Sequence, residues 1–128
     1  MRCVILPLAV LLLAAAPVPK PSRADKLADQ LVGGWEGAHL LVITKGRAAY
    51  HHGGRPREYD LRVDASGKVP AYEMRGRGRV AHIVLRGIFH VEGDILTLCY
   101  HSAGREKPTD FEGEGKGTYI AHYKRKRR

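Results

Sequence analysis

The stretch that decides the fold is LRGIFHVEGDILTLCY, from Leu85 to Tyr100. Apolar and polar side chains alternate on both sides of Glu92-Gly93, which predicts two antiparallel strands joined by a two-residue turn. In the register that this turn sets, Phe89 pairs with Leu96. One face of the hairpin is then apolar and faces a core, and it carries Leu85, Phe89, Leu96, Leu98 and Tyr100.

The opposite face of the hairpin ends in Cys99 and His101, which share one side of the strand because they are two residues apart. Either this face is exposed to solvent or a second apolar layer covers it. Gly87 lies within the first strand, where a glycine leaves room for the residue opposite, Leu98, or marks a bend round a barrel.

Short strand signals separated by glycine-rich turns continue on both sides of the hairpin. Before them, Ser22 can cap a short amphipathic helix, since Asp25 follows by three residues and apolar residues recur on one face through Leu31. This pattern predicts a small all-β barrel or sandwich preceded by one short helix, and the 15 glycines fit its tight turns. The expected strands are HLLVIT, RAAYHH, EYDLRV, PAYEMR, VAHIVLRGIFHV, DILTLCYH and GTYIAHYK.

The first residues have the layout of a secretory signal peptide, assigned to residues 1–24. Arg2 precedes an apolar run from Val4 to Ala16, which is shorter than the roughly twenty residues that span a membrane. We expect cleavage near residue 16 or 24 and an extracytoplasmic mature chain, secreted or periplasmic; an uncleaved N-terminal membrane anchor is the alternative. Cleavage removes Cys3 and leaves one cysteine, Cys99, which excludes a disulfide within the mature chain.

The remaining length fits one barrel domain, residues 25–123, followed by a basic C-terminal tail, KRKRR, at 124–128. Lysine and arginine total 22 against 13 aspartates and glutamates, a net charge of +9. Arg2 and the tail contribute six of these basic residues, so the folded surface is expected to be only mildly basic. A polybasic tail attracts polyanions such as anionic lipid headgroups or cell-wall polymers, and otherwise remains solvated.

Three segments carry a family resemblance: LVGGW from Leu31, YDLRVDASGKVPAYEM from Tyr59, and GIFHVEGDILTLCYHSAGREKPTDF from Gly87. In this order they resemble a small lipocalin-like domain family of unknown function that is abundant in planctomycete bacteria. The resemblance implies a lipocalin-like antiparallel β-barrel, often exported, without an established activity. Because HLLVITKG follows Trp35 sooner than in that family, a shortened or missing first strand could leave the barrel incomplete.

Cys99 and His101 invite a catalytic or metal-binding hypothesis. Cys/His catalysis requires hydrogen-bond contact, whereas neighbours on one face of a strand are held parallel, roughly 6–7 Å apart. A structural role for Cys99 as a small hydrophobic residue is therefore favoured. His82 would share a strand with His90 and lie diagonally near His101, so the weak candidate metal ligands are His82, Cys99 and His101. We expect no catalytic residue, no metal and no other cofactor.

Arginine alternates with glycine in RGRGR, from Arg75 to Arg79. RNA-binding segments of this kind are usually long and disordered, whereas this short one predicts a charged turn at a barrel rim. HHGGRPRE, from His51 to Glu58, is a second turn of similar character. No specific nucleic acid is expected, and the candidate anion-binding residues are Arg75, Arg77, Arg79, Lys124, Arg125, Lys126, Arg127 and Arg128.

The leading functional hypothesis is a monomeric, non-enzymatic module that binds a small apolar ligand or a protein. An eight-stranded barrel can hold one small ligand or fill itself with side chains, and this short chain favours a mostly filled interior. The alternative is an adaptor that binds an anionic envelope surface through the basic tail; a metal- or thiol-dependent protein centred on Cys99 and His101 is the third hypothesis. The candidate ligand-binding and core residues are Trp35, Leu85, Phe89, Leu96, Leu98 and Tyr100.

Overall fold

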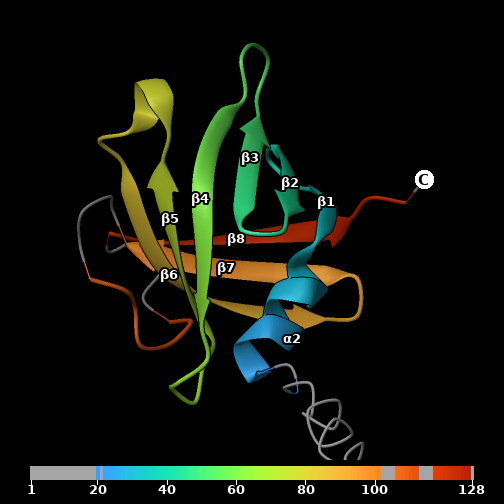
Figure 1. The fold of residues 1–128 in the computed structure, drawn as a ribbon, viewed down its shortest axis with the longest axis vertical. Coiled ribbons are helices and arrows are strands. Elements are labelled where there is room, and N and C mark those ends of the chain that lie inside the picture. The colour runs from blue at the N-terminus through green and yellow to red at the C-terminus, as the bar shows by residue number, and fades with distance from the viewer. Residues whose placement is uncertain (1–19, 21, 102–105, 113–116, 128) are drawn as a thin grey trace, which may run out of the picture.

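The structure is a computed structural model that describes residues 20, 22–101, 106–112 and 117–127. Residues 1–19 and 21 of the predicted signal segment, and Arg128 of the predicted tail, lie outside the described residues. The described chain forms a closed barrel of eight antiparallel strands in sequence order, which confirms the all-β barrel preceded by one short helix (Figure 1). The strands are β1 (Gly33–Glu36), β2 (Leu40–Thr44), β3 (Arg47–His51), β4 (Arg57–Asp64), β5 (Ala71–Gly76), β6 (Val84–Glu92), β7 (Ile95–His101) and β8 (Thr118–Arg125).

The helix α2 (Arg23–Leu31) precedes the barrel and is capped by Ser22, as the sequence predicts. Ser22 Oγ accepts a hydrogen bond from the Asp25 backbone N–H at 3.1 Å, and the Asp25 carboxylate accepts one from the Ser22 N–H at 3.2 Å. This exchange satisfies backbone donors that the start of a helix leaves without intrahelical partners. Leu31 is buried in the barrel core and Leu27 packs against it, so α2 covers one end of the barrel (Figure 1).

The barrel closes although β1 has only four residues. β1 pairs with β8 at Trp35↔Arg125 and Glu36↔Lys124. The first strand is therefore short, but the barrel is not incomplete. Lys124 and Arg125 belong to β8, which corrects the prediction that a separate basic tail begins at residue 124.

Arg125 lies at the centre of this seam. Its guanidinium carbon is 4.2 Å from the centroid of the Trp35 ring. Its terminal N–H groups donate to the carbonyl oxygens of Gln30 at 3.0 Å and Val32 at 3.2 Å, at the C-terminal end of α2, where a positive charge is favourable. Trp35 Nε1 in turn donates to the carbonyl oxygen of Leu31 at 2.8 Å. One arginine thus joins the last strand, the first strand and the helix.

The hairpin of β6 and β7 has the predicted faces, but the predicted pairs are wrong by two residues: Phe89 pairs with Leu98 and not with Leu96. The turn is Gly93-Asp94, and Gly93 has a φ of 60°, which suits the first central position of a type II′ turn. A shift of two keeps every side chain on its predicted face. β6 also begins later than predicted, because the short helix η1 (Gly78–Val80) and a turn precede it.

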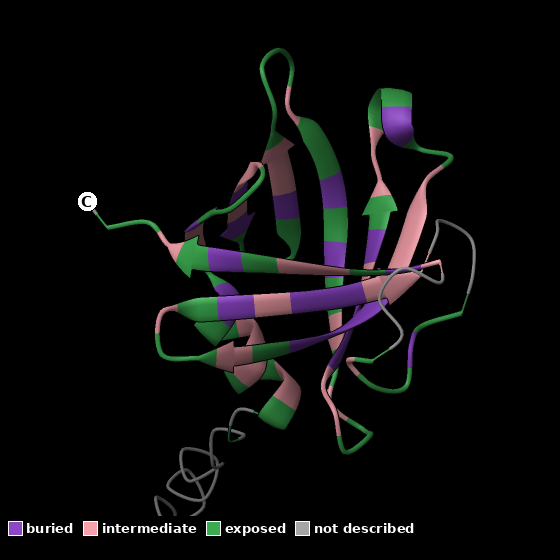
Figure 2. Cartoon of the chain, turned by 180° about the vertical axis from the view of Figure 1, so that it is seen from behind, coloured by how far each residue is buried: buried purple, intermediate pink, exposed green. Residues whose placement is uncertain are grey.

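Apolar residues form two layers, one inside the barrel and one outside. The inner layer includes Trp35 and Phe89, and buried residues alternate with exposed ones along β4 as its inward positions join that layer (Figure 2). Outside, Ile88 and Cys99 are buried, with Phe111 packed against them. The face that carries Cys99 is therefore covered by a second apolar layer, and Cys99 is 0% exposed.

All six tyrosines of the chain occupy inward-facing strand positions. Tyrosine is a suitable lining for an interior that reaches solvent, because its ring is apolar and its hydroxyl is polar. The interior thus combines a core of aliphatic and aromatic side chains with tyrosine rings. Tyr59, Tyr72 and Tyr123 are buried, Tyr50 and Tyr100 are partly buried, and Tyr119 is 52% exposed.

Gly87 makes room for Tyr72, its partner on β5, and not for Leu98 as the sequence suggests. A Cβ atom at Gly87 would lie 2.7 Å from two ring carbons of Tyr72 and 2.4 Å from the carbonyl oxygen of Cys99. The absence of a side chain at Gly87 therefore lets the Tyr72 ring lie directly against the backbone of β6.

Replacing Gly87 with alanine should lower the free energy of unfolding by about 1–3 kcal/mol, because the added methyl group overpacks the Tyr72 ring and the β7 backbone. Urea denaturation followed by Trp35 fluorescence measures this change. Gly67→Ala is the matched control: its Cβ would meet the Val69 carbonyl oxygen at 3.7 Å, and stability should change by less than about 0.5 kcal/mol. Equal stability of the two variants would contradict the close Tyr72–Gly87 contact.

Candidate ligand-binding site

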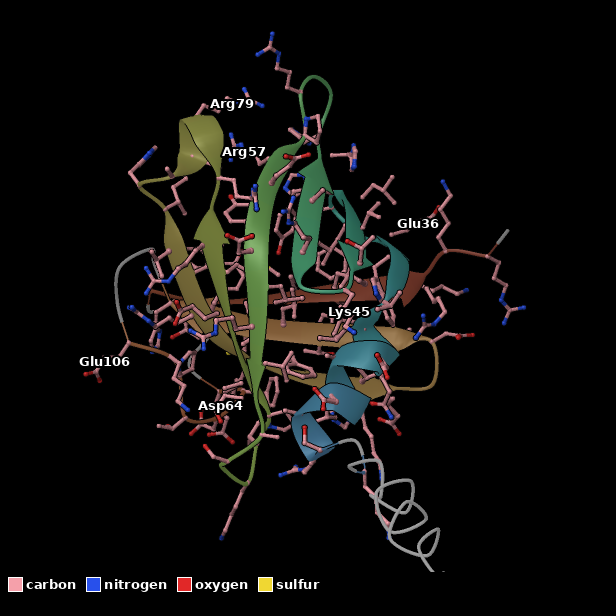
Figure 3. All side chains as sticks on the ribbon, in the orientation of Figure 1. Glu36, Lys45, Arg57, Asp64, Arg79 and Glu106 are labelled. Carbon is pink, nitrogen blue, oxygen red and sulfur yellow. The ribbon has the colours of Figure 1, made fainter. Side chains whose placement is uncertain are left out.

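A cavity of about 340 Å³ opens into the barrel between the β3–β4 loop and η1. This loop and η1 lie at the opposite end of the barrel from α2 (Figure 1). We call it the mouth cavity. Its volume lies at the lower end of the range of small-ligand pockets, roughly 300–1,000 Å³. β4 links the two ends of the barrel, with Arg57 at the mouth and Asp64 at the other end (Figure 3). The mouth cavity is lined by His39, Tyr50, His52, Gly53, Gly54, Arg55, Arg57, Tyr59, Arg79, Leu85 and Tyr100.

The floor of the mouth cavity is aromatic. Tyr50 and Tyr59 meet edge to face with ring centroids 5.7 Å apart, and Tyr100 stacks on Tyr119 at 5.6 Å. Leu85 adds an aliphatic side chain beside these rings. Such a floor can pack against the apolar part of a ligand and direct hydroxyl groups toward its polar part.

Burial keeps the interior tyrosine hydroxyls protonated. Burial is the main cause of the raised pKa of these tyrosines. Neighbouring tyrosines raise the pKa of Tyr50, Tyr72, Tyr100 and Tyr123 further, because two phenolates would repel one another. The pKa of Tyr59 is also raised by burial, while the positive charge of Arg57 acts in the opposite direction. The floor therefore consists of neutral hydroxyl groups at physiological pH. The raised values are those of Tyr50, Tyr72 and Tyr100, and that of Tyr123, which rises to about 12.

Arginine and histidine side chains surround the opening. Arg57 on β4 and Arg79 on η1 lie at the same end of the molecule (Figure 3). Arg79 Nη2 donates to the carbonyl oxygen of Arg55 at 2.7 Å, which ties η1 to the β3–β4 loop. The Nδ1 atoms of His39 and His52 share a hydrogen bond of 2.9 Å, which ties the β1–β2 loop to the same segment. The rim is thus held together by contacts between three separate loops.

Three larger hollows lie elsewhere on the barrel. One, of about 680 Å³, borders the start of α2 and the β4–β5 turn. Two of its arginines have protein partners: Arg23 donates to the carbonyl oxygen of Ala65 at 2.9 Å, and Arg86 lies 3.7 Å from Glu73. A second, of about 590 Å³, crosses β6 to β8 beside Phe111. A third, of about 470 Å³, lies over β2 and β3. The mouth cavity differs from these hollows in the number of interior tyrosines that line it: it has Tyr50, Tyr59 and Tyr100, whereas the hollow beside α2 has Tyr72.

The predicted ligand-binding residues divide into two groups. Leu85 and Tyr100 line the mouth cavity, whereas Trp35, Phe89, Leu96 and Leu98 are buried in the core. The sequence analysis did not identify several other lining residues, and all but one of these lie within or directly beside HHGGRPRE. A charged turn with a tyrosine on each adjoining strand is therefore the sequence signal that could have identified them. The missed residues are His39, Tyr50, His52, Gly53, Gly54, Arg55, Arg57 and Tyr59.

The arginines of RGRGR do not form one patch. Arg75 forms an ion pair with Glu73, and an Nη1 group of Arg77 lies 2.8 Å from an Asp60 carboxylate oxygen. Both pairs lie on outward-facing strand positions or beside them. Of the three candidates in this segment, Arg79 is the one that lines the mouth cavity.

Part of the C-terminal positive charge is offset by Asp94. Arg125 and Arg127 approach this carboxylate at 3.7 and 3.1 Å. Lys124 and Lys126 are exposed, and Arg128 lies outside the described residues. The described part of KRKRR is therefore partly integrated into the barrel.

The weak metal-ligand candidates each have another environment. His101 Nδ1 lies 2.9 Å from Thr118 Oγ1, and Cys99 Sγ donates to the carbonyl oxygen of Asp110 at 3.5 Å. His82 lies in the turn before β6, so the prediction that it shares a strand with His90 is wrong. Among the residues that the structure describes, no three His, Cys, Asp or Glu side chains are grouped so as to hold a metal ion.

Comparisons of the chain with protein-family models, with curated proteins and with solved structures found no match. Within the described ranges, no helix is long and apolar enough to cross a membrane.

The tyrosine cluster predicts a loss of stability at alkaline pH. Because burial raises the pKa of Tyr72 and Tyr123, the folded chain retains protons that the unfolded chain releases above about pH 10. Their contribution is complete below that pH and declines as the pH rises toward the folded-state pKa. Urea unfolding at a series of pH values above about pH 9 should therefore show a falling free energy of unfolding.

Tyr72→Phe should reduce the slope of this decline by about 1.4 kcal/mol per pH unit, since one titrating group is removed. If neither Tyr72→Phe nor Tyr123→Phe changes the slope, the tyrosines are not responsible for the alkaline sensitivity.

Proposed function

We propose that the chain is an exported, non-enzymatic barrel domain that binds a small ligand in the mouth cavity. The observation that carries this proposal is the contrast between the two ends of the barrel. The end near α2 is filled by Trp35, Phe89 and their neighbours, whereas the other end leaves about 340 Å³ above a tyrosine floor. The sequence resemblance to small lipocalin-like domains and the secretory layout of residues 1–24 support the same proposal.

The placement of the most reactive side chains favours binding over catalysis. Cys99 and His101 project from the outer face of β7, away from the mouth cavity, since Leu98 and Tyr100 occupy its inner face. Cys99 is fully buried there, so a substrate in the cavity would not reach its thiol. The cavity itself presents neutral hydroxyls, guanidinium groups and imidazoles, which suit recognition of a polar group.

A bulky side chain in the mouth should block binding. We expect Leu85→Trp to weaken the binding of the neutral fluorescent probe N-phenylnaphthylamine at least about tenfold, because the indole occupies the space above the tyrosines. Fluorescence titration of the mature chain measures the affinity. Ile95→Trp is the matched control: it adds the same ring at an outward position that is 44% exposed, and the affinity should stay within about twofold of wild type.

Circular dichroism of both variants establishes that the barrel is retained. Equal affinity in wild type and Leu85→Trp, with the barrel intact, would show that the probe binds elsewhere and would refute the mouth as the binding site.

A further inference from the structure

The described lining of the mouth cavity combines positively charged side chains with no carboxylate. Among the described residues that line it, three are arginines, two are histidines and none is aspartate or glutamate. Six of the eight described arginines outside the mouth cavity approach a carboxylate within 4.0 Å; these are Arg47, Arg75, Arg77, Arg86, Arg125 and Arg127. The charge at the mouth is therefore available to an anionic ligand, and its field concentrates anions near the cavity.

The arginines come from different elements and meet above one floor. Arg57 extends from the start of β4, beside Tyr59, and Arg79 extends from η1 across the opening (Figure 3). The bond from Arg79 Nη2 to the Arg55 carbonyl oxygen fixes one amino group. No residue in the described part of the chain accepts a hydrogen bond from Nε or Nη1 of this guanidinium, so both can serve another acceptor. A guanidinium that is held in this way suits a carboxylate or phosphate, which accepts two parallel N–H donors.

The floor adds a second requirement to the ligand. Tyr50, Tyr59 and Tyr100 present rings to the cavity, with Leu85 beside them. The Tyr50 hydroxyl donates to Met74 Sδ at 3.7 Å, whereas the neutral hydroxyls of Tyr59 and Tyr100 can donate hydrogen bonds to an anion but cannot neutralise a cation. Rings below and guanidinium groups above suit a molecule with an apolar body and a negative end.

We infer that the mouth cavity binds a small organic anion, with its ring or short apolar chain on the tyrosine floor and its carboxylate or phosphate group between Arg57 and Arg79. This inference rests on the proposed function and names the ligand class of the same site. It assigns Arg57 and Arg79 as the residues that select the anion.

Two probes with the same ring system separate charge from apolar binding. Anilinonaphthalene sulfonate is anionic, and N-phenylnaphthylamine is its neutral counterpart. The wild-type mature chain should bind the anionic probe at least about tenfold more tightly than the neutral probe, and Arg57→Gln combined with Arg79→Gln should remove that difference. The neutral probe should bind wild type and this double variant equally within about twofold.

The matched control is Arg47→Gln combined with Arg86→Gln, which removes the same charge at residues outside the mouth cavity. It should retain the preference for the anionic probe. Loss of the preference in both double variants would attribute it to net charge and overturn the inference. If the neutral probe binds as well as the anionic one in wild type, the inference fails while the proposed function stands. If neither probe binds, both fail.

Competition identifies the headgroup. Benzoate and phenyl phosphate carry the same ring with a carboxylate or a phosphate, and benzyl alcohol supplies the ring without charge. Displacement of the anionic probe by either anion, with little displacement by the alcohol, supports the inference, and the stronger competitor names the headgroup. Equal displacement by all three compounds would contradict it.

Discussion

The contact of Arg125 with Trp35 is the interaction on which the rest of the structure depends. It lies where β1 and β8 meet, at a seam of two residue pairs. The guanidinium stacks on the indole and also binds the carbonyl oxygens of Gln30 and Val32. A cation–π contact contributes about 0.5–1 kcal/mol at an exposed site and about 2 kcal/mol when it is desolvated. The same guanidinium thus contacts the C-terminal end of α2, and it also approaches Asp94. Several weak contacts therefore close the barrel together.

Closure at this seam determines which end of the barrel can bind a ligand. Trp35 is 0% exposed, and its Nε1 bond to Leu31 holds the end of α2 against the core. The aliphatic and indole side chains at that end leave little space for a ligand. At the other end, single hydrogen bonds of Arg79 with Arg55 and of His39 with His52 join the rim loops. The tyrosines below these loops leave the mouth cavity open.

The sequence predicts the fold class, the capped helix and the two faces of the hairpin, because each depends on a local pattern. It does not predict the register, since a shift of two residues leaves the alternation of side chains unchanged and Gly93 can occupy either central position of a two-residue turn. The end of the last strand was also predicted wrongly. Arg125 lies on the same inward face of β8 as Tyr123, but its charge and that of its neighbours suggested a solvated tail. The mouth could not be predicted as a site, because His39, Arg57 and Arg79 come together only when the barrel closes.

The central claim is that ligands enter the barrel at the tyrosine-lined end. The most direct test is to map amide chemical shifts of the mature chain during titration with the anionic naphthalene probe. The expected result is that the largest changes occur at Arg57, Tyr59, Leu85 and Tyr100. Changes concentrated at Arg23, Ala65 and Glu73, around the hollow beside α2, would contradict the account.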